Sequence, residues 1–294
     1  MKKLSRPIRK IGLIANSDKP SCRDLLRQAA RLITRAKGAV LTETATAQLG
    51  KLRTQIFADA ATLAHQVDLL MVFGGDGTML RVAREVAGSG TPILGINIGA
   101  LGFLTDVQAH QLPLALEQIW AGETILESRP LIEARGIASG RRVLLRALND
   151  VVITRGAAPR LIDLDVTVDE AALTRYRCDG LIVCSPTGST AYSLAAGGAV
   201  VSPSAEVFTL TPICPHTLSN RSVIVNLSAI IRVQVLSRKS ETILTADGQP
   251  PIALATGDTI AVRRSRQSIQ LLHLAGSSFF ETLRRKLNWS GSNV

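Results

Sequence analysis

The chain has 294 residues, of which 46% are hydrophobic and 19% are charged, a balance that excludes a disordered protein and predicts two globular domains. The net charge of +11 suits the attraction of nucleotides or polyphosphate, whereas nucleic-acid binding needs a basic face with aromatic residues, which make up only 3%. No apolar run has the length of a membrane helix or signal peptide, so we expect a cytoplasmic enzyme with no membrane partner.

The first part of the chain alternates between two hydrophobic patterns. Three apolar runs are typical of buried parallel strands: Lys10–Ala15, Val67–Phe73 and Pro92–Asn97. Three segments have the apolar spacing of helices: Asp24–Ala36, Thr78–Ala87 and Leu112–Trp120. This alternation predicts an N-terminal α/β domain with a parallel sheet over residues 1–126.

From about Glu127 the pattern becomes that of a mainly antiparallel β domain, which we expect over residues 127–276. Apolar and polar residues alternate in Ile162–Val168 and in Ile231–Val235. The basic segment Arg263–Gln267 is predicted as a hairpin bend before a further strand. Ser277–Trp289 has helical spacing, so we expect residues 277–294 to form a closing helix that returns to the N-terminal domain.

Cysteine and histidine spacing does not indicate a metal site. No pair forms Cys-x-x-Cys, and the four histidines add no ligand spacing. We therefore expect no structural zinc and four free thiols, at Cys22, Cys178, Cys184 and Cys214.

The most informative segment is Val72–Thr78, in which an apolar strand runs into a Gly-Gly-Asp-Gly turn and then a helix. Such turns lie at the ligand edge of an open α/β sheet, and their glycines let the backbone approach an anion. The carboxylate of Asp76 is suited to hold a metal, to bind a sugar hydroxyl or to take a proton from one. The alternative is a tight turn with a capping aspartate.

A second segment, Cys178–Gly198, runs from an apolar strand, Gly180–Cys184, into a loop rich in serine, threonine and glycine. Its hydroxyl and backbone groups can surround a polar ligand, and Tyr192 offers a ring beside them. The chain has neither a P-loop pattern nor a dinucleotide-binding Gly-x-Gly-x-x-Gly pattern after a strand.

Three shorter segments are weaker signals. The adjacent Asn149 and Asp150 suit a sugar hydroxyl or a base edge, although by themselves they are better interpreted as a turn. His216 lies in a proline-rich segment, Thr211–Ser219, and a lone histidine is more often structural. Thr245–Gln249 is typical of an Asp-Gly hairpin turn.

Together these segments resemble the NAD kinase family. The elements of the family pattern occur in the same order: Gly-Gly-Asp-Gly-Thr at 74–78, Leu-Gly-Phe-Leu-Thr at 101–105, the pair Asn149–Asp150, the run Asp179–Tyr192, Pro-Ile-Cys-Pro-His at 212–216 and Asp-Gly-Gln at 247–249. The run Asp179–Tyr192 is highly specific, whereas Gly-Gly-Asp-Gly also occurs in lipid kinases and phosphofructokinases.

The resemblance implies a cytoplasmic enzyme that transfers the terminal phosphoryl group of ATP, or of polyphosphate, to the 2′-hydroxyl of the adenosine ribose of NAD. The reaction uses a divalent cation such as Mg²⁺. Members of the family have an α/β N-terminal domain and a mostly β C-terminal domain with the NAD site between them. They are homodimers or homotetramers.

The resemblance also implies roles for individual residues. Asp76 corresponds to the catalytic base, and the phosphates lie beside Gly74, Gly75, Gly77 and Thr78. The residues assigned to NAD are Gly77, Phe103, Asn149, Asp150, Asp179, Thr190, Ala191, Tyr192, His216 and Gln249. Three positions depart from the usual pattern, namely Ala100 in place of Asn, Asp150 in place of Glu and Ala199 in place of Pro.

Two other functions are compatible with the Gly-Gly-Asp-Gly element. One is a lipid kinase of the diacylglycerol type, which the run Asp179–Tyr192 and the lack of an amphipathic membrane segment disfavour. The other is a non-catalytic dinucleotide sensor, which the intact Asp76 and its glycines disfavour.

Overall fold

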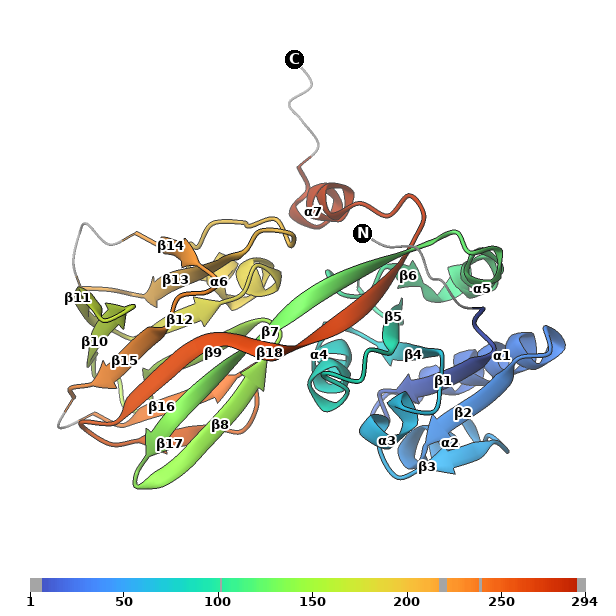
Figure 1. The fold of residues 1–294 in the computed structure, drawn as a ribbon, viewed down its shortest axis with the longest axis horizontal. Helices are drawn as coiled ribbons and strands as arrows, with labels where there is room; N and C mark the ends of the chain where they lie inside the picture. The colour runs from blue at the N-terminus through green and yellow to red at the C-terminus, as the bar shows by residue number, and fades with distance from the viewer. Residues whose placement is uncertain (1–6, 101, 217–220, 238–239, 290–294) are drawn as a thin grey trace, which may run out of the picture. The chain divides into compact units, whose positions relative to one another are not determined.

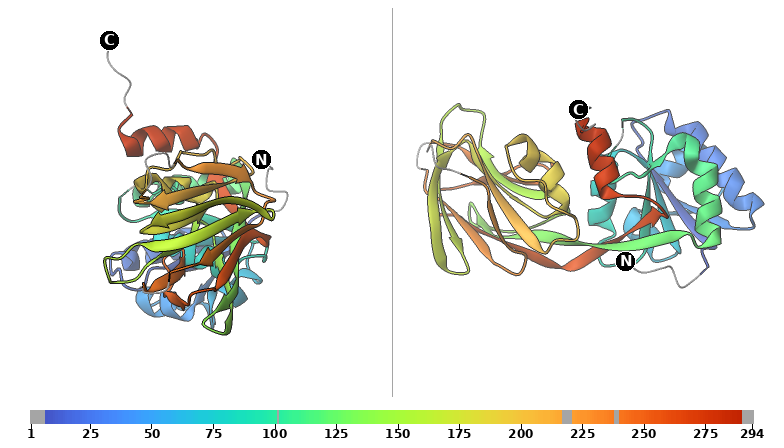
Figure 2. Two further views of the ribbon diagram at one scale, coloured as in Figure 1. Left: turned by 90° about the vertical axis from the view of Figure 1, so that its left-hand side faces the viewer. Right: turned by 90° about the horizontal axis from the view of Figure 1, so that it is seen from above.

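The protein is described here by a computed structural model that covers residues 7–100, 102–216, 221–237 and 240–289. The chain divides into two compact units, unit 1 (Met1–Arg129 with Ser268–Val294) and unit 2 (Pro130–Gln267) (Figures 1 and 2). Parts of three predicted segments lie outside the described residues, namely Leu101, residues 217–219 and residues 290–294.

Unit 1 is built on a parallel sheet with the strand order β5-β4-β1-β2-β3. Its strands are β1 (Lys10–Ala15), β2 (Ala39–Glu43), β3 (Gln55–Phe57), β4 (Leu69–Gly74) and β5 (Pro92–Asn97). Two further segments pair parallel with β5: the short β6 (Val107–Gln108) and the end of β18 (Thr259–Leu274).

Helices cover both faces of this sheet. They are α1 (Cys22–Arg35), α2 (Thr44–Gly50), α3 (Ala60–Ala64), α4 (Asp76–Glu85) and α5 (Leu112–Ala121), with a short 3-10 helix, η1 (Ala109–Gln111). A further helix, α7 (Phe279–Leu287), follows β18. The apolar stripes of α1 and α5 share one core with alternate residues of β1 and β4, such as Leu13 and Phe73. On the other face, a Cβ at Gly12 would lie 3.3 Å from Leu63 of α3. Because both faces are buried, the central strands are apolar throughout.

Unit 2 contains two antiparallel sheets whose inner faces share one core. One sheet has the order β14-β13-β12-β9-β16-β17, from β9 (Asp150–Arg155), β12 (Gly180–Cys184), β13 (Val207–Ile213), β14 (Val223–Asn226), β16 (Thr242–Ala246) and β17 (Ile252–Leu254). The remaining strands are β7 (Thr124–Ala138), β8 (Arg141–Ala147), β10 (Ile162–Val168), β11 (Ala171–Cys178), β15 (Ile231–Val235) and the first part of β18. The helical segments η2 (Thr187–Thr190) and α6 (Tyr192–Ala195) follow β12.

The expected fold class is confirmed, with a parallel sheet first, antiparallel β structure afterwards and a closing helix. The hairpin bend predicted at Arg263–Gln267 is wrong, because β18 is one continuous strand across it. The charge of this segment is balanced by acidic residues of other elements. For example, Arg263 Nε donates a hydrogen bond to Glu133 Oε1 of β7 at 2.8 Å. The division of the chain into domains at residues 126 and 276 stays a prediction.

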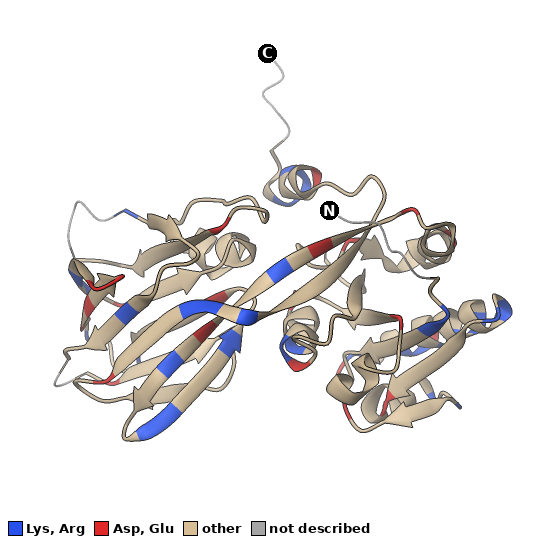
Figure 3. Cartoon of the chain, in the orientation of Figure 1, with Lys and Arg blue, Asp and Glu red and all other residues tan. Residues whose placement is uncertain are grey.

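Charge is spread over elements of both units. Figure 3 shows lysine and arginine on β8 and β18 as well as on α7, with acidic residues interspersed along the chain. Among the described helices, none is long and apolar enough to cross a membrane. All four cysteines are free thiols in the described part of the chain.

A partly buried ion cluster lies in unit 1 around His273, near the end of β18. The His273 ring bonds to Asp106 through Nδ1 and to Glu127 through Nε2, the second contact measuring 2.9 Å. Arg129 donates to the same Glu127 carboxylate at 2.8 Å. Burial lowers the pKa of His273, but the hydrogen bonds and charges of the two carboxylates raise it to about 9.

We expect this cluster to stabilise the protein in a pH-dependent way. Because the folded pKa of His273 lies above its ordinary 6.5, the stabilisation is full below pH 6.5 and lost as the pH rises through about 9. Thermal melts of His273→Gln and the parent protein should therefore differ most below pH 6.5 and converge above pH 9. The control is His65→Gln, since His65 is an exposed histidine of the same unit. An equal difference at both pH values would contradict this assignment.

Candidate active site

The Gly-Gly-Asp-Gly turn connects β4 to α4 at the carboxyl edge of the parallel sheet of unit 1. Gly75 is the N-cap of α4, and Asp76 is its first residue, two positions earlier than the predicted helix start. A Cβ at Gly74 would lie 2.4 Å from Thr78 Oγ1, so packing requires that glycine. A Cβ at Gly75 or Gly77 would meet no atom within 4 Å, and neither has a positive φ. The fold therefore does not require these two glycines, which leave room for a ligand.

The carboxylate of Asp76 is held by the loop between β5 and β6. Its Oδ2 accepts a hydrogen bond from the backbone N–H of Phe103 at 2.9 Å, and its Oδ1 accepts one from Leu104 at 3.1 Å. A Cβ at Gly102 would lie 2.1 Å from Asp76 Oδ1, so the loop approaches the carboxylate too closely for any other residue. These bonds go to the loop, which favours a site residue over a capping aspartate.

The ring of Phe103 is half-buried against α7 within unit 1. Its centroid lies 6.5 Å from that of Phe279, and Lys286 Nζ lies 4.6 Å from the ring centroid. The second distance is that of a cation–π contact. The C-terminal helix thus contributes to the position of the loop that holds Asp76.

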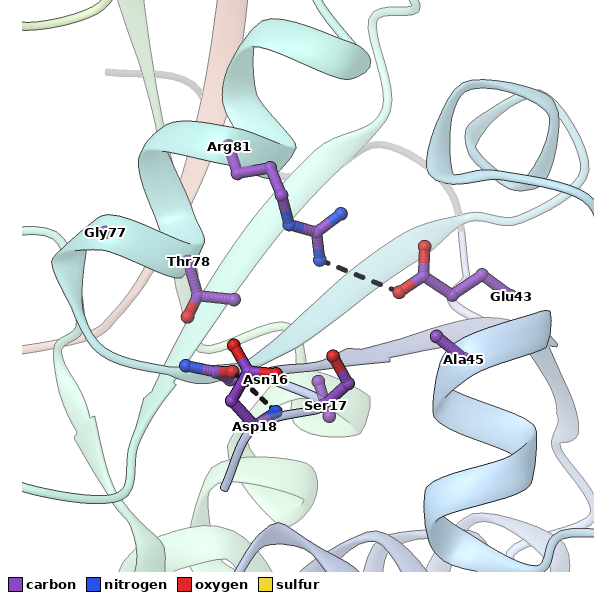
Figure 4. A pocket seen from close by; sticks show the side chains of 9 residues that line it. Asn16, Ser17, Asp18, Glu43, Ala45, Gly77, Thr78 and Arg81 are labelled. Carbon is purple, nitrogen blue, oxygen red and sulfur yellow. Dashed lines mark hydrogen bonds and ion pairs between the residues drawn. The ribbon is translucent and has the colours of Figure 1, made fainter. Parts of the chain in front are cut away.

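A cavity of about 460 Å³ opens beside the turn (Figure 4). Gly77 and Thr78 line it, together with the segment after β1, residues 16–18. Arg81 and Glu43 point toward one another there, with 3.7 Å between Arg81 Nη2 and Glu43 Oε1. Burial raises the pKa of Glu43, and the charge of Arg81 opposes that rise.

The sequence did not predict this cavity because its residues come from four separate elements, β1, β2, α2 and α4. The available signal was position in the sheet, since residues 16–18 follow a strand at the same edge as the glycine turn.

In unit 2, Asn149 and Asp150 lie where β9 begins. The carboxylate of Asp247 accepts hydrogen bonds from the backbone N–H groups of Leu148 at 2.8 Å, Asn149 at 2.9 Å and Asp150 at 3.3 Å. Asp247 and Gly248 both have positive φ and lie between β16 and β17, so the predicted hairpin turn is confirmed. The turn also fixes the backbone of the Asn149–Asp150 pair.

Asp150 is buried, with 7% of its surface exposed. Burial raises its pKa to about 7, and the negative charge of Asp247 adds to that rise. Near neutral pH this carboxyl group can therefore either donate or accept a hydrogen bond. Such a group is suited to a ligand that offers both a donor and an acceptor, as a ribose hydroxyl or an adenine edge does.

The loop after β12 closes on Asn149. The backbone N–H of Ser185 donates to the Asn149 carbonyl at 2.8 Å, and a Cβ at Gly188 would lie 2.2 Å from that carbonyl oxygen. Thr190–Tyr192 follows directly, and Tyr192 is 46% exposed. Because Cys184 pairs with Asp150, this segment lies at the same end of the β9–β12 pair as Asn149 and Asp150.

Two other predicted residues lie at the opposite end of that strand pair. Asp179 precedes β12 and accepts a hydrogen bond from Arg155 Nε at 2.7 Å. His216 is exposed, and its backbone N–H donates to the Arg177 carbonyl at 2.8 Å. The structure therefore divides the candidate residues of unit 2 into two groups.

Gln249 belongs to the hairpin that holds Asn149. Its side-chain amide donates to the backbone carbonyls of Arg146 at 3.0 Å and Ala246 at 2.8 Å. These two bonds give the amide nitrogen a structural role that the sequence did not indicate.

Unit 1 thus has a Gly-Gly-Asp-Gly turn after a strand of its parallel sheet, and unit 2 has a Thr-Gly-Ser-Thr loop after a strand of an antiparallel sheet. Residues 11–124 match the ATP-NAD kinase N-terminal domain, and residues 148–274 match the ATP-NAD kinase C-terminal domain. The chain belongs to the NAD kinase family.

Individual relatives agree with this assignment. The chain is 46% identical over 235 residues to an NAD kinase of Syntrophotalea carbinolica, covering 79% of this chain and 81% of that one. It is 42% identical over 285 residues to an NAD kinase of Moorella thermoacetica, covering 97% and 91%.

Solved structures show the same similarity. A yeast NADH kinase complexed with NADH matches with a TM-score of 0.88 and 26% identity, covering 99% of this chain and 90% of that one. An NAD kinase from Archaeoglobus fulgidus in complex with ATP matches with a TM-score of 0.74 and 26% identity, covering 96% and 100%. Neither the lipid kinase nor the dinucleotide sensor is favoured by these matches.

Proposed function

We propose that this NAD kinase transfers the terminal phosphoryl group of ATP to the 2′-hydroxyl of the adenosine ribose of NAD, giving NADP, with Asp76 as general base. The observation that carries the proposal is the Asp76 carboxylate, held by two backbone N–H groups beside the open backbone of Gly75 and Gly77. Relatives described as complexes with NADH and with ATP support both nucleotides.

Phosphoryl transfer depends on positioning and on charge stabilisation more than on covalent help from the protein. In the proposed reaction the ribose hydroxyl gives its proton to Asp76 as its oxygen bonds to phosphorus and the bond to the leaving ADP breaks. The N–H groups of Phe103 and Leu104 keep the carboxylate in place. The N-terminus of α4, with Gly75 and Gly77, favours the phosphate oxygens.

A divalent cation with ATP is part of the proposal. Within the described residues, no group of three or more His, Cys, Asp or Glu side chains is arranged to hold a metal ion. Mg²⁺ bound to nucleotide phosphates needs only one or two protein carboxylates. Asp18 in the adjoining cavity is suited to this, and the cation would neutralise charge on the donor phosphates.

For NAD, we propose contacts from one end of the β9–β12 pair in unit 2. The residues are Asn149, Asp150 and the segment Thr190–Tyr192, whose polar groups and exposed ring suit a nucleoside. The roles of Gly77, Phe103, Asp179, His216 and Gln249 toward NAD stay predictions from the resemblance.

Four further points belong to the same proposal. Polyphosphate is an alternative phosphoryl donor, and the protein acts in the cytoplasm. The chain is organised as domains 1–126 and 127–276 with a closing segment, 277–294.

The protein assembles as a homodimer or homotetramer. Sedimentation measures the assembly state, and a fully active monomer would contradict the proposed assembly.

Replacing Gly75 by alanine tests the phosphate-binding turn. We expect kcat/KM for ATP to fall about 10²-fold, because the methyl group would occupy space that the phosphates need. The melting temperature should not change, since no atom lies within 4 Å of that Cβ. The contrasting variant is Gly74→Ala, whose Cβ would lie 2.4 Å from Thr78 Oγ1, and which should lower the melting temperature. Unchanged kinetics for Gly75→Ala would remove Gly75 from the phosphate site.

The proposed reaction is tested with the purified protein, NAD, Mg²⁺ and either ATP or polyphosphate. NADP is then detected with an NADP-specific dehydrogenase. If a folded preparation forms no NADP with any donor and with several divalent metals, the proposal is wrong.

A further inference from the structure

Thr105, in the loop between β5 and β6, has a side chain that the packing of unit 1 does not explain. It is fully buried, and within the described part of the chain its Oγ1 has no hydrogen-bond partner. A buried hydroxyl without a partner destabilises a fold, and a valine of the same shape avoids this cost. The hydroxyl therefore calls for an explanation other than stability.

The orientation of Thr105 directs this hydroxyl toward the site. A Cβ placed on Gly95 of β5 would lie 3.0 Å from the Thr105 methyl carbon, so the methyl group faces the sheet. A Cβ placed on Gly102 would lie 2.5 Å from Thr105 Oγ1 and 2.1 Å from Asp76 Oδ1. Thr105 Oγ1 and Asp76 Oδ1 thus both lie close to the position of this Cβ. The distance between the two oxygens cannot exceed the two distances added together.

The Asp76 carboxylate has room for another donor. An ionised carboxylate offers about four acceptor sites. Two are used by the N–H groups of Phe103 and Leu104. A hydroxyl that donates to the ionised form lowers the pKa of a carboxyl group and fixes its orientation.

We propose that Thr105 is a positioning residue for the reaction, whose hydroxyl donates to the Asp76 carboxylate and keeps it aligned when substrate binds. This inference rests on the proposed role of Asp76 as general base.

The decisive variant is Thr105→Val, which keeps the shape and removes the hydroxyl. We expect kcat to fall about tenfold, as for the loss of a hydrogen bond to a charged group, with little change in either KM. The melting temperature should not fall.

The chain provides a matched control in Thr124, at the start of β7 in the same unit. It too is buried, and its Oγ1 has no partner among the described residues. Thr124→Val should therefore leave kcat unchanged. Thr105→Ser retains the hydroxyl and should keep kcat near normal, whereas Thr105→Ala should not. This second pair tests the inference if the valine variant folds poorly.

The outcomes separate the inference from the proposed function. In an Asp76→Asn background, Thr105→Val should cause no further loss, because it acts through Asp76. Normal turnover in Thr105→Val would overturn the inference. So would an additional, independent loss in the double variant. If Asp76→Asn alone keeps near-normal turnover, it is the proposed role of Asp76 that fails.

Discussion

Replacing Asp76 by asparagine is expected to reduce kcat by about 10²–10⁴-fold, the usual contribution of a positioned general base. The amide keeps the shape of the side chain but cannot take the proton of the ribose hydroxyl. The backbone N–H groups of Phe103 and Leu104 each donate a hydrogen bond to the carboxylate. The amide has one oxygen in place of two, so it can keep only one of these two bonds in its present geometry. We therefore expect a small decrease in melting temperature together with the large loss of turnover.

The matched control is Asp59→Asn. Asp59 also lies at the N-terminus of a helix in unit 1, where its side chain accepts a hydrogen bond from the Thr62 N–H at 2.7 Å. This variant should have a comparable effect on stability and none on kcat. Steady-state kinetics and thermal melts of both variants make the comparison. Near-normal turnover in Asp76→Asn would reassign the residue to holding the loop.

Replacing Asn149 by alanine is expected to raise KM for NAD about ten- to a hundredfold, following the energy of the lost hydrogen bonds. The backbone of Asn149 is anchored without its side chain, since its N–H donates to Asp247 and its carbonyl accepts from Ser185. The melting temperature and KM for ATP should therefore change little. Asp150→Ala should raise KM for NAD similarly, and loss of its buried carboxyl group should not lower the melting temperature at neutral pH.

The contrasting variant is Asp247→Ala, which removes the acceptor of three backbone N–H groups. It should lower the melting temperature and impair both substrates. Both KM values, measured alongside a thermal melt, separate binding from structural effects. If Asn149→Ala behaves as Asp247→Ala does, the binding role of Asn149 is wrong.

Sequence patterns predicted the long apolar elements best. Strands β1, β5, β12 and β15 have the expected bounds. Their residues are either apolar throughout or alternately apolar and polar, and these patterns follow directly from which side chains are buried. The short elements between Ala39 and Ala64 were not assigned, since each has too few residues for a clear period. The error at Arg263–Gln267 arose because charge in that segment is neutralised by residues distant in the chain.

The candidate site was predictable where its signal is local. The glycine turn around Asp76 could be recognised because strand, glycines and helix follow one another in the sequence. The partners of Asp76 could not, because its two N–H donors lie 27 and 28 residues away. The same holds for Asp247, whose carboxylate fixes the Asn149 backbone from 98 residues away.

The most direct test of the account follows the phosphoryl group itself. The purified protein is incubated with Mg²⁺, ATP labelled in its terminal phosphate and either NAD or an NAD analogue that lacks the adenosine 2′-hydroxyl. We predict that label enters NADP, that phosphorus NMR places the new phosphate on the 2′-oxygen of the adenosine ribose, and that the analogue stays unlabelled. Label on the analogue, or a phosphate at another hydroxyl of NAD, would contradict it.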